Sequence, residues 1–106
     1  MSYNKIEKSE AKRIGATAHK NSGRGMKKAD ASDDQFVIDF KFVKKSFTIN
    51  KNVWSKIVTD ALSVDHSKSP VIMVVMGEDV KVRLAIIEWS DFELLKEGYK
   101  NGKDNN

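Results

Sequence analysis

Two charged side chains on one predicted strand are the residues of this chain best suited to chemistry. Asp39 and Lys41 lie two positions apart in the segment QFVIDFKF, which spans residues 35–42. Alternate side chains of an extended strand point to opposite faces, so these two share one face, and the other face is apolar: Phe36, Ile38, Phe40 and Phe42. Their Cβ atoms are expected roughly 6 to 7 Å apart. A carboxylate and an ammonium therefore sit side by side on a rigid support.

Further carboxylates lie within reach in the sequence. Asp30 ends the glycine-containing segment GRGMKKAD, nine residues before Asp39, and Glu7 and Glu10 lie three residues apart in a predicted helix, on neighbouring positions of one face. Carboxylate oxygens are the ligands that Mg²⁺ prefers, and a nearby lysine can orient or deprotonate an attacking water. These residue types are the ones that metal-assisted cleavage of a phosphodiester requires.

The simpler interpretation is structural. Taken alone, an Asp-x-Lys tripeptide is common, and such a pair is more often an exposed ion pair on a half-buried strand. The combination of an acidic helix, a basic loop with two glycines, Asp30 and this strand favours the catalytic interpretation.

Composition limits the chain to one small domain and favours a polyanionic partner. It has 106 residues, 40% of them hydrophobic, with a net charge of +4 and a pI near 9.3. The residues expected to contact DNA phosphates flank the candidate site: Arg24, Lys27, Lys28, Lys44, Lys45 and Lys51. The chain has no cysteine, and the apolar run at residues 71–76 is too short to span a bilayer, so a reducing cytoplasm is the expected location.

The periodicity of apolar residues predicts a mixed sheet flanked by helices, an α/β class. Helices are expected at residues 3–17, at residues 51–64 with Asn50 or Thr48 as the cap, and after a capping box at Ser90 to Glu93. Strands are expected at residues 29–32, 36–43, 71–76 and 80–88. Residues 1–97 should form a single nuclease domain, and residues 98–106 a flexible tail.

This order of residues resembles the PD-(D/E)xK nuclease superfamily, and within it the Holliday junction resolvases of archaea and phages. In that family a helical glutamate precedes a loop with serine and glycine, an aspartate, and a strand with Glu-x-Lys or Asp-x-Lys. The matching pieces here are Glu7 or Glu10, then SGRG at 22–25, KAD at 28–30 and IDFK at 38–41. The similarity continues through residues 44–57 and spans most of residues 5–97, although no proline precedes Asp30.

The resemblance implies a restriction-endonuclease-like fold and a Mg²⁺-dependent enzyme, with Mn²⁺ as a substitute. Asp30, Asp39 and Lys41 would carry metal binding and catalysis, and Ser22 would help to hold the scissile phosphate. Glu7 is preferred to Glu10 as the helical ligand because it keeps the longer separation from Asp30 that the family tends to show.

The implied substrate is a four-way DNA junction, cut by paired nicks from a homodimer, in the host cytoplasm if the chain is phage-encoded. Two alternatives remain open. One is a related nicking or repair nuclease that acts on other DNA structures, and the other is a basic DNA-binding module without catalysis.

Overall fold

One mixed β-sheet organises the protein. The computed structural model describes residues 3–19 and 29–104. The elements follow in the order α1 (Tyr3–Arg13), β1 (Thr17–Ala18), β2 (Ala31–Ser32), β3 (Phe36–Val43), α2 (Lys51–Val64), β4 (Ser69–Met76), β5 (Val82–Ile86) and α3 (Trp89–Asp104). The predicted α/β class, a mixed sheet with flanking helices, is confirmed.

The strands lie in the order β1-β2-β3-β4-β5. β3 and β4 are parallel and pair along their whole length, from Phe36 opposite Ser69 to Val43 opposite Met76, and the other neighbouring pairs are antiparallel. α2 makes the crossover that a parallel pair requires, and Asn50 caps its start by accepting a hydrogen bond of 2.9 Å from the Val53 N–H.

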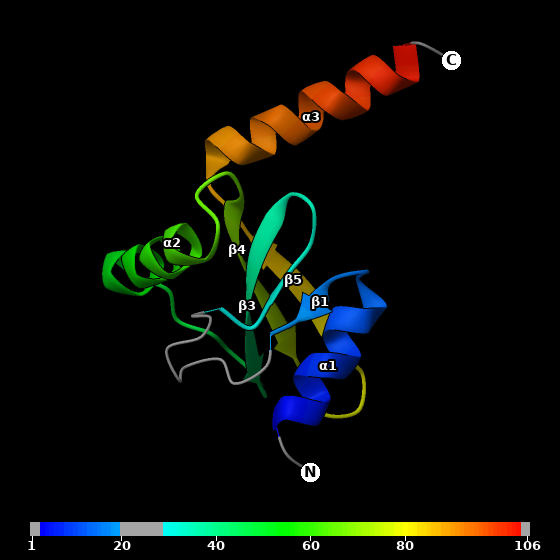
Figure 1. Ribbon diagram of the computed structural model, residues 1–106. Helices are drawn as coiled ribbons and strands as arrows, with labels where there is room; N and C mark the ends of the chain where they lie inside the picture. The colour runs from blue at the N-terminus through cyan, green and yellow to red at the C-terminus, as the bar shows by residue number, and fades with distance from the viewer. Residues whose placement is uncertain (1–2, 20–28, 105–106) are drawn as a thin grey trace.

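The two faces of the sheet carry different layers. On one face Ala11 of α1 joins a buried cluster with Ile38 and Phe40 of β3, and on the other face Ile57 of α2 packs with Ile72 and Val74 of β4. Figure 1 shows α1 and α2 on either side of the sheet. The alternation predicted for β3 is therefore confirmed, and Asp39 and Lys41 lie on the face that α2 covers.

α1 ends earlier than its composition suggests. The helix stops at Arg13, and Gly15 follows with a φ of 75°. Its N–H donates to the Lys12 carbonyl, and the Ala16 N–H donates to the Ala11 carbonyl, which together make a Schellman motif. The chain then turns into β1, a two-residue strand that is too short to leave a periodic signal in the sequence.

α3 runs further than expected and stands apart from the sheet. It begins at Trp89, so Ser90 lies inside its first turn instead of capping it, and it continues to Asp104. In Figure 1 it projects from the end of the sheet, and its start is tied down where the Ser69 hydroxyl donates to Asp91 at 3.1 Å. Within residues 3–19 and 29–104, no helix has both the length and the apolar character needed to cross a membrane.

Candidate active site

The candidate site lies at an edge of β3 that β2 leaves open. β2 pairs with β3 only at Ala31 opposite Ile38 and Ser32 opposite Val37. Beyond this short ladder, the Asp30 N–H donates to the Ile38 carbonyl at 3.1 Å, and Asp30 Oδ2 accepts the Phe40 N–H at 2.8 Å. The carboxylate of Asp30 thus replaces the next strand partner and is fixed beside Asp39.

Asp39 and Lys41 form a partly buried ion pair. Lys41 Nζ lies 3.0 Å from Asp39 Oδ2, and the Asp39 side chain is only 17% exposed. This oxygen is buried and has no partner with hydrogen-bond geometry in the described part of the chain. Burial, followed by the negative charge of Asp30, raises the pKa of Asp39, and the neighbouring ammonium of Lys41 opposes the shift. The site therefore holds a carboxylate oxygen that the protein itself leaves incompletely satisfied.

Glu7 reaches the same group from α1. Its pKa is raised from 4.5 to about 7 by burial, by the charge of Asp30, by a hydrogen bond to the Asp30 side chain, and by the charge of Asp39. Glu7 therefore keeps its proton up to near neutral pH. The structure thus brings together Glu7, Asp30, Asp39 and Lys41, which the sequence had separated into three segments.

Glu10, the alternative helical ligand, is engaged elsewhere. Its side chain is buried, with the residue 4% exposed, and accepts two hydrogen bonds of 2.9 Å from the Arg83 guanidinium of β5. These hydrogen bonds lower the pKa of Glu10 against the opposing effect of burial. Glu7 is therefore the glutamate of α1 that the fold places beside Asp30 and Asp39, and Glu10 instead ties α1 to β5.

One basic residue at the site was not among those predicted from the motif. Lys56 of α2 lies 2.8 Å from Asp60 Oδ2, one helical turn away, and this hydrogen bond is the main reason that its pKa is raised. Smaller contributions come from the charges of Asp39 and Asp30, so the ammonium of Lys56 also acts on the carboxylates. An i, i+4 Lys–Asp pair was visible in the sequence, but its position over β3 depends on the parallel crossover.

The predicted DNA-contacting residues are only partly described. Lys44 and Lys45 are exposed directly after β3, with Lys44 3.3 Å from Glu78, and Lys51 is exposed at the start of α2. Four predicted residues lie outside the described ranges: Ser22, Arg24, Lys27 and Lys28.

The donor set fits a hard divalent cation. Asp30, Asp39 and Glu7 supply only carboxylate oxygens, and the buried Asp39 Oδ2 has an ion pair with Lys41 but no partner with hydrogen-bond geometry among the described residues. As the side chains stand, no three acidic or histidine side chains in the described ranges surround a common point. Glu7 instead keeps a proton up to about pH 7, so a cation bound here would compete with that proton.

The raised pKa of Glu7 predicts how stability depends on pH. Because the folded state holds the Glu7 proton up to about pH 7 and the unfolded state releases it near 4.5, the folded state binds more protons in this interval. The Glu7 contribution to the free energy of unfolding should therefore fall as pH rises from about 4.5 to beyond 7. Glu7→Gln, which cannot ionise, should gain stability relative to the parent protein over the same interval.

Urea unfolding in EDTA at about pH 4.5, 6, 7 and 8 measures this difference. The matched control is Glu93→Gln, which removes an exposed carboxylate of α3, and its stability relative to the parent should stay level. A Glu7→Gln difference that does not change with pH would contradict the raised pKa of Glu7.

Comparison with protein-family models, with curated proteins and with solved structures found no match for this chain. The interpretation of the site therefore rests on its geometry, its charges and the motif that its residues form.

Proposed function

We propose that this protein is a Mg²⁺-dependent endonuclease that cuts branched DNA, with the four-way junction as its substrate. The observation that carries the proposal is the convergence of Glu7, Asp30, Asp39 and Lys41 beside β3, where its ladder with β2 ends. An exposed surface ion pair would not need a mostly buried carboxylate, or a second carboxylate that raises its pKa.

Each residue has a role that follows from its position. Asp30 and Asp39 would hold the cation through their carboxylates, with Glu7 joining them once it has lost its proton. A bound Mg²⁺ supplies positive charge to the scissile phosphate and lowers the pKa of a coordinated water. Lys41, held beside Asp39, would stabilise negative charge on the phosphate oxygens and orient the attacking water.

The proposal extends to the fold family and to the oligomeric state. The mixed sheet with helices on both faces is compatible with the restriction-endonuclease-like fold that the motif implies. A homodimer would present two such sites related by symmetry, which suits paired nicks on opposite strands of a junction. Mn²⁺ is expected to replace Mg²⁺, and the cytoplasm remains the predicted location.

DNA would be gripped through its phosphates and recognised by shape. The lysines beside the site are exposed and flexible, and they carry charge without the fixed planar donors that read base edges. The described candidates for this role are Lys44, Lys45 and Lys51, with Lys56 added by the structure.

Substitutions at the site test the enzyme directly. Asp30→Asn and Asp39→Asn should reduce Mg²⁺-dependent cleavage of a four-way junction below detection, and Lys41→Ala should slow it about 10²- to 10³-fold, because each removes charge from the reacting phosphate or its cation. Junction binding, measured by gel shift in EDTA, should persist. Asp79→Asn, in the exposed turn after β4, makes the same chemical change and should cut at the parent rate. Parent-rate cleavage by a site variant would remove that residue from the mechanism.

Lys56 is tested through the salt dependence of binding. Lys56→Gln should lower the slope of log K against log salt by about one, because one phosphate contact is lost. Lys68→Gln is the matched control, since Lys68 also pairs with an aspartate one turn away, Asp65 at 3.8 Å. An equal effect of the two substitutions would show that Lys56 contributes only general surface charge.

The choice of substrate is tested by comparing four-way, flap and linear duplex DNA with Mg²⁺. We expect the four-way junction to be cut fastest, with paired nicks across it. Equal cutting of linear duplex would reject the junction-resolving function in favour of a nicking or repair nuclease that acts on other DNA structures. Tight binding of all three without any cutting would leave only a DNA-binding module.

A further inference from the structure

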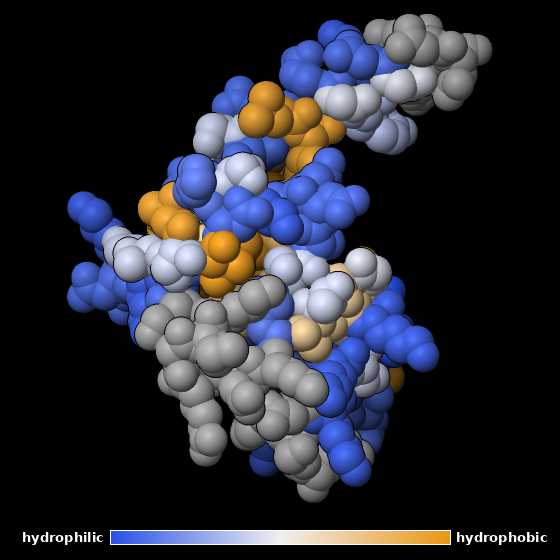
Figure 2. Space-filling view, in the orientation of Figure 1, coloured by the Kyte–Doolittle hydropathy of each residue, from blue (hydrophilic) through white to orange (hydrophobic). Residues whose placement is uncertain are grey.

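Few buried side chains hold α1 on the sheet. Between residues 5 and 13, the buried side chains are those of Glu10 and Ala11, and Ile6 is only partly buried. Ala11 packs in one cluster with Ala31 of β2 and Phe40 of β3. Figure 2 shows largely hydrophilic surface over α1. An alanine methyl group removes little apolar area from water, so apolar burial contributes little to fixing the place of this helix.

The other buried side chain of α1 makes a directional contact with β5. Arg83 Nε and Nη2 each donate a hydrogen bond of 2.9 Å to the Glu10 carboxylate, one to each oxygen. The side chains of Glu10 and Arg83 are 6% and 28% exposed, so water has little access to the pair. A planar guanidinium that binds a carboxylate through two hydrogen bonds fixes its orientation as well as its distance.

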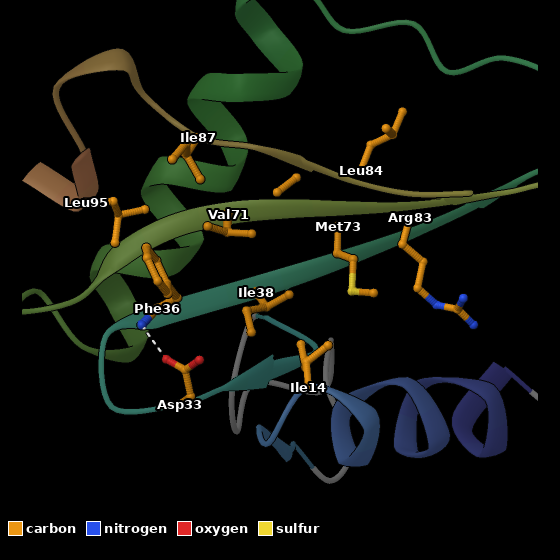
Figure 3. Close-up of a pocket in the computed structure, with 11 residues that line it drawn as sticks. Ile14, Asp33, Phe36, Ile38, Val71, Met73, Arg83, Leu84, Ile87 and Leu95 are labelled. Carbon is orange, nitrogen blue, oxygen red and sulfur yellow. Dashed lines mark hydrogen bonds between the residues drawn. The ribbon is translucent and has the colours of Figure 1, made fainter. Parts of the chain in front are cut away.

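Apolar packing does not fill the space beside this ion pair. An open cavity of about 310 Å³ lies there, and its lining includes Ile14 directly after α1, Met73 of β4, and Arg83 and Leu84 of β5. Figure 3 shows the Arg83 side chain extending from β5 toward α1. Leu84 is 46% exposed and Ile14 is 38% exposed. The ion pair thus joins α1 to β5 where the apolar side chains leave a gap.

The place of α1 decides where Glu7 lies. Glu7 precedes Ala11 by four residues, so the two side chains share one face of the helix. Ala11 packs in the same cluster as Phe40, the residue that follows Asp39 and donates its N–H to Asp30. A rotation or shift of α1 would therefore carry Glu7 away from both aspartates.

We propose that Arg83 is a positioning residue for the candidate site. By binding Glu10 it sets the rotation and the place of α1, and this holds Glu7 beside Asp30 and Asp39. The role rests on the proposed function only for what Glu7 does there, as a ligand of the cation. The position of Glu7 itself is a property of the free protein.

A buried ion pair is better suited to orientation than to stability. Removing two charges from water offsets much of their attraction, and apolar side chains of similar volume are often equally stabilising or more so. An apolar pair would also suit the cavity that Arg83 lines. Such a pair has no preferred direction, however, so it would not fix the rotation of α1. Position and stability can therefore be separated by substitution.

Binding of Mn²⁺ to the DNA-free protein, measured by electron paramagnetic resonance at about pH 7.5, tests the role. Arg83→Lys keeps the charge but loses the paired planar donors, and it should weaken Mn²⁺ binding about 10-fold or more, as is typical when a group that orients a ligand is removed. Arg13→Lys is the matched control, since Arg13 is exposed on α1 itself and lies 3.6 Å from the same Glu10 carboxylate. Parent-like binding by Arg83→Lys, or equal loss in both variants, would overturn the proposal.

A double variant separates the position of α1 from its stability. Glu10→Leu combined with Arg83→Met leaves no unpaired buried charge, so it should unfold at a urea concentration no lower than Arg83→Lys does. It should nevertheless bind Mn²⁺ as weakly as Arg83→Lys. Parent-level Mn²⁺ affinity in this variant would show that the ion pair only stabilises the fold, and would overturn the positioning role.

Absence of Mn²⁺ binding by the parent protein would refute the proposed metal site, and the role of Arg83 would then be decided without metal. In EDTA, the stability difference caused by Glu7→Gln should change with pH in the parent background and stay level with pH in the Arg83→Lys background. The same pH dependence in both backgrounds would overturn the positioning role. A level difference only with Arg83→Lys would support it even if the protein cuts no DNA.

Discussion

The hydrogen bond from the Phe40 N–H to Asp30 Oδ2 is the contact on which the candidate site depends. β2 contributes only two residues to the ladder, so the next donor along the edge of β3 needs another acceptor. A buried N–H without an acceptor costs about 1–3 kcal/mol. The Asp30 carboxylate fills that position, and in doing so it is held where its charge acts on Asp39 and Glu7.

Three carboxyl groups in one place repel one another, and the fold offsets this repulsion in two ways. Lys41 and Lys56 supply positive charge from β3 and from α2, and Glu7 keeps a proton near neutral pH. A ligand could replace both contributions. A bound cation could displace the proton of Glu7, and a phosphate group could pair with Lys41 and Lys56. In the proposed function, this electrostatic cost would favour the binding of a metal ion and a polyanion.

Most of the central fold was predictable from the sequence, because strong periodicity marks buried elements. Three patterns each predicted an element that the structure contains: the alternation in β3, the apolar run of β4 and the helical spacing in α2. They are strong because each element is buried on one or both faces. β1 was missed because two residues carry no period. The reach of α3 to Asp104 was missed because its later turns lack an apolar pattern, and in the described structure these turns project away from the sheet.

For the candidate site, the sequence by itself determined that Asp39 and Lys41 share one face of a strand, because that follows from the two-residue period of an extended chain. It also identified Asp30 and the pair Glu7 and Glu10 as carboxylates of interest, but it left the choice between the glutamates open. Only the tertiary structure decided that Glu7 lies near Asp30 while Arg83 of β5 binds Glu10, and that the charge of Lys56 acts on Asp39 and Asp30. These contacts join residues far apart in the chain, and they depend on how helices settle on the sheet, which no local pattern encodes.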